Sequence, residues 1–263
     1  MLHEDQLPDE VQQTPVEAVP ELGPAEAIVV PVPERVPFWG YDDLLLVMGL
    51  LIAAIVVIGL IAGAFVAFYP KMQADPTPLL LPTQLAVYAL IYFIFRLVFG
   101  MKYRKPVFQS LGWRRSPLNL AVAAAGGVVL AVALSGIASV LHTPKVDNPF
   151  EKLLGSRTML LLFGLIAVTL APLFEELLFR GFIQPLLSRT FGTIAGIVLT
   201  AALFGSLHAP EYSWAWQYAL FISLAGAVFG WLRARTDSII PSTVMHGCFN
   251  AVSFAALLFS KNI

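Results

Sequence analysis

Two acidic side chains and an arginine stand inside a long apolar segment of the sequence, residues 159–187. Glu175 and Glu176 are followed by Arg180. An isolated charge at the centre of a bilayer costs about 2.5–3.5 kcal/mol even on lenient insertion scales. Glu176 and Arg180 are four residues apart, the favourable order for an ion pair on one helical face, whereas Glu175 points about 100° away. The spacing predicts a structural pair beside a carboxylate that is available for chemistry. The alternative is one buried polar contact formed by all three.

Two further apolar segments carry polar side chains at helical spacing. Phe204 and His208 are four residues apart, as are His246 and Asn250, so each pair lies on one helical face. A buried carboxylate can take a proton from water, an imidazole can relay it, and His or Asn donors can stabilise an oxyanion. Peptide hydrolysis needs all three functions. Taken singly, His208 also fits a wetted histidine at a helix end, and His246 with Asn250 fits a hydrogen-bonded contact between helices.

Together the three motifs resemble those of the CAAX-protease and bacteriocin-processing family of intramembrane peptidases, which includes the type II prenyl-protein endopeptidases. The resemblance covers roughly residues 155–256. It implies that Glu175 activates a water with help from His208, while His246 and Asn250 steady the oxyanion. The residues with supporting roles would be Glu176, Arg180 and Phe204.

The same side chains form an alternative ligand set for one divalent metal such as zinc. Glu175, His208 and His246 with a water resemble a catalytic zinc site, and members of the family are commonly called metalloproteases. Because Asn250 is a poor zinc ligand and the motifs supply only two histidines, we prefer a mechanism without a tightly held metal.

The composition places these residues in a membrane protein. Hydrophobic residues make up 58% of the 263 and charged residues 13%, with a mean hydropathy of +0.78, against about 25% charged in soluble proteins. Long unbroken apolar runs predict an all-α, polytopic transmembrane helical bundle of about seven to eight spans. The seven segments are Leu44–Phe68, Gln84–Phe99, Leu118–Leu141, Met159–Leu187, Thr193–His208, Tyr218–Trp231 and Ile239–Phe259. Glycine pairs predict close helix approach at Gly59/Gly63, Gly192/Gly196 and Gly226/Gly230.

Straight helices would not bring the polar motifs to one depth. Counted from the expected cytoplasmic ends, Glu175 and His208 lie much deeper than His246. We therefore expect at least one of these spans to be strongly tilted or broken, with a kink at Pro172 or a late start near Pro241.

Lysine and arginine in the short loops predict the orientation. The loop after the second span is basic and lacks acids, so it should be cytoplasmic. Threading from it places eight cations inside (Lys102, Arg104, Lys105, Arg114, Arg115, Arg189, Arg233 and Arg235) and five outside (Lys71, Lys145, Lys152, Arg157 and Lys261). The expected location is the plasma membrane of a prokaryote, with the N-terminus in the cytoplasm.

The chain divides into three predicted regions. Residues 1–37 form a disordered, proline-rich tail in which eight acids precede Arg35, residues 38–150 an N-terminal transmembrane region, and residues 151–263 the catalytic region. The expected partners are the bilayer and a membrane-associated protein or peptide substrate. Nucleic-acid binding has no support, because the basic residues are not interleaved with stacking aromatics, and the oligomeric state is unknown.

Two functions other than proteolysis stay open from the sequence. The polar cluster fits a non-catalytic membrane binding or scaffold protein, for example one that confers bacteriocin immunity. It also fits an ion-coupled transporter, although no second Glu-Glu or His-x-x-x-Asn motif supplies the repeat symmetry expected there.

Overall fold

The computed structural model describes residues 37–144, 146 and 157–260, and the residues from Arg35 onward group into one compact unit. Apart from Pro37, the predicted N-terminal tail lies outside the described residues. The described part is helical and contains no strand, which confirms the all-α prediction. The boundary near residue 150 stays a prediction.

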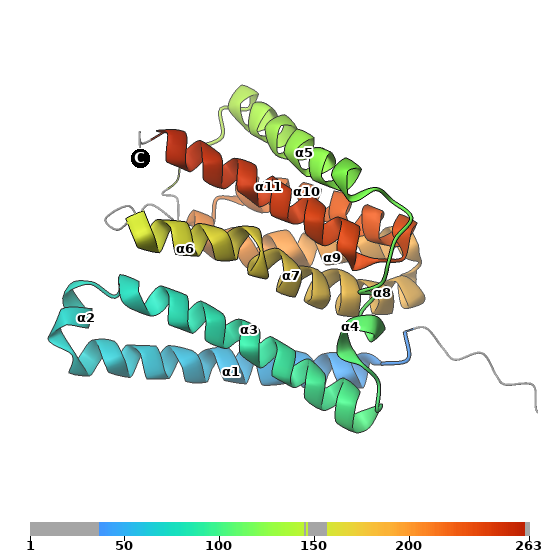
Figure 1. The fold of residues 1–263 in the computed structure, drawn as a ribbon, viewed down its shortest axis with the longest axis horizontal. Coiled ribbons are helices and arrows are strands. Elements are labelled where there is room, and N and C mark those ends of the chain that lie inside the picture. Colours follow the sequence, from blue (N-terminus) through green and yellow to red (C-terminus); the bar gives the residue numbers. More distant parts are fainter. Residues whose placement is uncertain (1–36, 145, 147–156, 261–263) are drawn as a thin grey trace, which may run out of the picture. The chain divides into compact units, whose positions relative to one another are not determined.

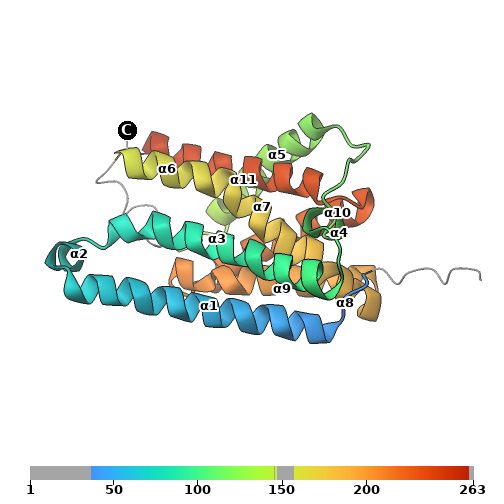
Figure 2. The same cartoon turned by 60° about the horizontal axis from the view of Figure 1, so that its bottom comes forward.

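The helices form an antiparallel pair followed by a bundle (Figures 1 and 2). The α-helices are α1 Tyr41–Phe68, α2 Pro70–Ala74, α3 Leu80–Leu97, α4 Val107–Ser110, α5 Leu120–Val140, α6 Arg157–Val168, α7 Leu170–Glu176, α8 Gln184–Phe191, α9 Thr193–His208, α10 Trp216–Thr236 and α11 Ile239–Ser260. Short 3-10 helices are η1 Thr77–Leu79 and η5 Ala209–Tyr212, and π-helices are η2 Val98–Lys102 and η4 Leu177–Ile183. Helix α1 packs on α3, α5 on α11, and α9 on both α8 and α10.

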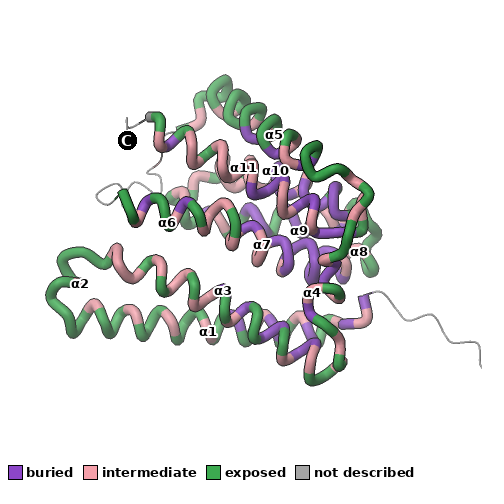
Figure 3. The backbone as a smooth tube through the Cα atoms, in the orientation of Figure 1, coloured by how far each residue is buried: buried purple, intermediate pink, exposed green. Residues whose placement is uncertain are grey.

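Six helical segments of the described chain are long and apolar enough to cross a bilayer. They correspond to six of the seven predicted spans. The remaining prediction, Tyr218–Trp231, lies within α10, which has the length of a span but carries Arg233 and Arg235 in its last turn. Outward faces of α1, α3 and α5 are exposed along much of their length, whereas buried residues gather along α7, α9 and α10 (Figure 3). The chain is thus an integral membrane protein whose outer side chains suit lipid.

The loop charges predict that several segment ends lie on the cytoplasmic side of the membrane. In the structure these ends meet at one end of the bundle. Arg114 forms an ion pair of 2.9 Å with Asp237, Arg189 Nη1 donates to Pro37 O at 2.6 Å, and Ile239 N donates to the carbonyl of Gly112 at 3.0 Å. Which side of the membrane this end faces stays a prediction.

The fourth span is broken, as expected. Helix α6 ends at Val168, Thr169 departs from ideal helical angles with φ −118° and ψ −71° while its N–H still donates to Leu165 O, and α7 follows. Pro172 explains the position, because it has no N–H for the carbonyl of Val168 and its ring crowds that carbonyl. Gly247 of α11 packs beside the same carbonyl, where a β-carbon would leave only 2.7 Å. Helix α11 runs without interruption past Pro241, so of the two expected positions only the one at Pro172 shows a break.

The end of the fourth span is widened into the π-helix η4. Trp39 packs against this turn and donates from Nε1 to Phe182 O at 3.1 Å, with the two rings stacked 5.7 Å apart. Phe95 at the end of α3 and Phe99 in η2 complete the cluster. This aromatic cluster fixes the turn that carries Arg180, and π-turns are frequent at functional sites.

The glycine predictions succeed for one pair, succeed for one member of a second pair and fail for the third. Gly226 and Gly230 approach Arg180 and Gln184 so closely that a β-carbon would lie 2.9 and 2.7 Å from those side chains. Gly196 packs on α8, where a β-carbon would lie 2.7 Å from Ser188 Cα, whereas Gly192 has open space around it. In the described structure nothing comes within 4 Å of a β-carbon at Gly59 or Gly63, so that pair does not mark a helix contact among the described residues.

Gly127 of α5 makes a closer approach, which leads to a stability prediction. A β-carbon there would collide with the backbone oxygen of Met245 in α11, and a backbone atom cannot rotate aside. We expect Gly127→Ala to separate α5 from α11 and to cost about 1–3 kcal/mol, as overpacking usually does. Thermal unfolding in detergent checks this. Gly136→Ala is the matched control, because it lies in the same helix with open space around it; equal melting temperatures for the two variants would contradict the prediction.

Candidate active site

The Glu176–Arg180 pair is completely buried. Arg180 Nη1 lies 2.9 Å from Glu176 Oε1, and both side chains are 0% exposed. Arg180 Nη2 also donates to Gly226 O at 2.9 Å, and its guanidinium carbon lies 4.4 Å from the centre of the Phe204 ring. The arginine therefore joins the fourth span to α9 and α10. The structural pair predicted from spacing is present.

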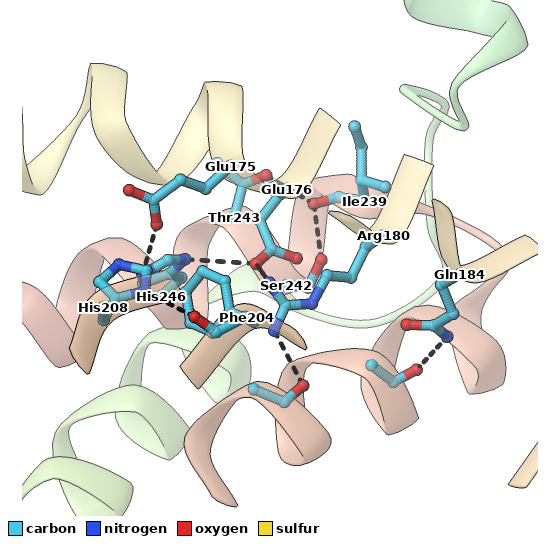
Figure 4. A network of polar contacts seen from close by, with 12 residues as sticks. Glu175, Glu176, Arg180, Gln184, Phe204, His208, Ile239, Ser242, Thr243 and His246 are labelled. Atoms are coloured by element: carbon cyan, nitrogen blue, oxygen red, sulfur yellow. Dashed lines mark hydrogen bonds and ion pairs between the residues drawn. The ribbon is translucent and has the colours of Figure 1, made fainter. Parts of the chain in front are cut away.

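His246 stands between the two glutamates (Figure 4). Its Nδ1 lies 3.2 Å from Glu176 Oε1 and its Nε2 lies 3.5 Å from Glu175 Oε2. The ring is stacked on Phe229 with centroids 4.6 Å apart. Because a carboxylate accepts hydrogen bonds, Nδ1 carries a hydrogen toward Glu176. A hydrogen bond between Nε2 and Glu175 would require one further proton shared between the two groups.

His208 is held in one tautomer by its own helix. Its Nδ1 lies 2.7 Å from Phe204 O, one turn earlier in α9. A carbonyl can only accept, so Nδ1 carries the hydrogen and Nε2 of the neutral ring keeps its lone pair. The imidazole also packs on the Phe204 ring, with centroids 4.5 Å apart. His208 thus presents a proton acceptor at the end of α9.

Asn250 joins α11 to the last turn of α6. Its Nδ2 donates to Ala167 O at 2.9 Å. That contact uses one of its two amide hydrogens and leaves the second hydrogen and Oδ1 for another partner. The oxyanion role assigned to Asn250 from the family resemblance stays a prediction.

One cavity of about 350 Å³ brings the motif residues together. Glu175, Phe204, His208, His246 and Asn250 all line it, and 25% of the Glu175 side chain is exposed there. These residues come from three separate segments of the sequence. The break at Thr169 and the helix packing have therefore brought them to one cavity.

One comparison with known proteins finds a similar family. Residues 157–252 match the family model described as type II CAAX prenyl endopeptidase Rce1-like. We call this part of the chain the Rce1-like segment. The match confirms the family resemblance of the three motifs, all of which lie inside it. It spans less than half of the chain. No curated protein and no solved structure gave a match.

Side chains outside the Rce1-like segment also build the cavity. Gln84 and Tyr88 of α3 line it, and Tyr88 stacks on Phe174 with ring centroids 4.9 Å apart. Sequence reasoning missed both, because neither is an unusual residue in an apolar helix.

Sequence reasoning also missed Glu211, an exposed acid three residues after His208 that lines the same cavity. Because Glu211 comes just after the fifth span, the sequence could have predicted that it lies near His208.

The candidate metal ligands do not form a ligand cluster. No three His, Cys, Asp or Glu side chains in the described ranges are grouped so that they could hold a metal ion. Glu175 and His246 lie together, but His208 does not complete a three-ligand set with them. The described side chains therefore do not supply the three-ligand alternative, and a mechanism without a tightly held metal stays a prediction.

Proposed function

We propose that the chain is an intramembrane endopeptidase that hydrolyses peptide bonds of membrane-associated proteins or peptides. The observation that carries the proposal is the common cavity of Glu175, His208, His246 and Asn250, with Glu175 Oε2 only 3.5 Å from His246 Nε2. The Rce1-like match supports a protease in general. The mechanism that follows is our own.

In the proposed reaction Glu175 removes a proton from a water that His208 Nε2 helps to orient. The water oxygen then bonds to the carbonyl carbon of the substrate, and the carbonyl becomes an oxyanion. His246 Nε2, carrying the shared proton, and the uncommitted amide hydrogen of Asn250 donate to that oxyanion. When the C–N bond breaks, Glu175 returns the proton to the leaving amine. Atoms and protons balance across the two steps.

The buried pair has a positioning role in this proposal. Glu176 accepts from His246 Nδ1 at 3.2 Å and so directs Nε2 toward Glu175. Arg180 neutralises Glu176, because an unpaired carboxylate in that position would be costly. The proposed location is a prokaryotic plasma membrane with a cytoplasmic N-terminus, and the substrate reaches the cavity from the bilayer or its surface.

The test is a comparison of protein termini in host membranes that carry the wild-type chain or Glu175→Gln at matched expression. We expect new termini that depend on Glu175, and these would also identify the substrate. If a cellular phenotype depends on the chain but survives in Glu175→Gln, the non-catalytic binding function would replace the proposal.

Chelation gives a separate prediction. Because the described Glu and His side chains form no three-ligand cluster, we expect EDTA or 1,10-phenanthroline to leave the cleavage rate of the purified protein within about twofold of its starting value. Rates are measured on a substrate found by the terminus comparison. A loss of activity that added zinc restores would show that the metal-free mechanism is wrong.

A further inference from the structure

A second cavity lies at the end of α3, away from the catalytic residues. It is an open groove of about 590 Å³ between the last turns of α3, the loop after η2 and helix α4. The lining residues are Tyr92, Arg96, Gly100, Arg104, Lys105, Pro106, Val107, Phe108 and Gln109. Three of them are cations and none is an acid. The groove belongs to the basic loop that the charge pattern places in the cytoplasm.

Two of these cations differ from the other basic residues near this end of the bundle. Lys102 is paired with Asp42 and Asp43 at 2.8 and 2.6 Å, and Lys105 lies over the Phe38 ring. Arg96 and Arg104 are exposed, and neither forms an ion pair with any residue that the structure describes. The groove therefore presents two guanidinium groups without an ion-pair partner among the described residues.

The backbone gives both arginines their positions. Gly100 lies one turn after Arg96, and the guanidinium of Arg96 occupies the space that a β-carbon at Gly100 would fill. Arg104 has a left-handed backbone with φ +54°, which is uncommon for a residue with a side chain. Charges scattered over a surface would need neither the glycine beside Arg96 nor the left-handed backbone at Arg104. The two features therefore indicate a preformed binding site.

The groove also has an apolar wall. The rings of Tyr92 and Phe108 lie 6.1 Å apart, and Val107 is buried beneath them. A ligand that fits must carry a compact anion at one end and an apolar part beside it. Arginine forks match phosphate oxygens, and basic pockets at membrane boundaries bind lipid head groups.

We propose that this groove binds the phosphate group of an anionic membrane lipid. Arg96 and Arg104 hold the phosphate, while the glycerol and upper acyl carbons lie along Tyr92 and Phe108. The site is independent of the proposed proteolysis, because none of its lining residues lines the catalytic cavity. It would attach the α1–α3 pair to the membrane surface at a defined depth.

The experiment measures lipid retained by the purified full chain in detergent, using native mass spectrometry with phosphatidylglycerol or phosphatidylcholine. We expect the wild type to prefer phosphatidylglycerol by roughly tenfold or more. Arg96→Gln with Arg104→Gln should abolish the preference. Gly100→Ala should weaken it severalfold although no charge is lost, because the added methyl group displaces the Arg96 guanidinium.

The matched control is Arg115→Gln with Arg235→Gln, which removes two exposed cations expected on the same membrane side but outside the groove. Melting temperatures show that every variant is folded. If the control pair loses as much preference as the groove pair, general surface charge explains the binding and the proposal is wrong. A second experiment compares inorganic phosphate with a short-chain phosphatidylglycerol as competitors for the bound lipid. If millimolar phosphate displaces the lipid as effectively as the short-chain lipid does, the groove is a free-phosphate site and the lipid assignment is overturned.

Discussion

Replacing Glu175 by Gln should lower the rate of peptide hydrolysis by about 10³-fold or more and leave the folded protein intact. A positioned general base contributes about 10²–10⁴-fold, and Glu175 is the carboxylate of this cavity that faces His246 Nε2 at 3.5 Å. Glutamine keeps the shape of the side chain, and its amide can donate to the same nitrogen. The substitution therefore removes the base without removing the contact. The measurement is the cleavage rate of a substrate found by terminus analysis, with purified protein in lipid nanodiscs.

Glu211→Gln is the comparison variant for this experiment. Glu211 lines the same cavity and is exposed, so its replacement removes a charge of the same kind from the same space. We expect a loss below about tenfold, since Glu211 has no proton-transfer role in the proposed reaction and acts on the reacting water only through its electric field. A Glu175→Gln variant that keeps more than a tenth of the wild-type rate would show that another group activates the water.

The sequence predicted most of the spans and the contents of the site because both depend on local properties. Apolar runs of bilayer length specify α1, α3 and α5 whatever they pack against. The cost of charge in a bilayer marked Glu176 and Arg180 as a pair, and the pair is present at 2.9 Å. Pro172 predicted the position of the break because its effect is also local. The missing N–H disturbs the helical turn in which the proline lies.

Features that depend on contacts between distant segments could not be predicted in this way. The π-turn η4 owes its support to Trp39 and Phe99, which lie far away in the sequence. Tyr88 belongs to the cavity only because α3 packs on α7. Glycine spacing failed at Gly59 and succeeded at Gly226 because spacing alone does not say which face of a helix meets another.

Arg180→Met should be the most destabilising single substitution in the site. It leaves Glu176, whose side chain is 0% exposed, with His246 and the Ser242 hydroxyl as its partners but without its cation. Breaking a buried pair from one side costs about 3–5 kcal/mol, a large part of the 5–15 kcal/mol that typically stabilises a protein. We expect a large fall in the melting temperature in detergent and a lower yield of folded protein.

The double variant Glu176→Leu with Arg180→Met separates stability from positioning. Removing both charges replaces the pair by apolar side chains of similar volume, which is often neutral or stabilising, so the melting temperature should return toward that of the wild type. Cleavage should stay lost, because His246 Nδ1 no longer has Glu176 as its acceptor and Nε2 is no longer directed toward Glu175. The wild type, Arg180→Met, the single variant Glu176→Leu and the double variant form a double-mutant cycle whose coupling energy measures the pair. A double variant that regains activity along with stability would mean that the pair serves the fold alone, and that Glu175, His208 and Asn250 position the water without it.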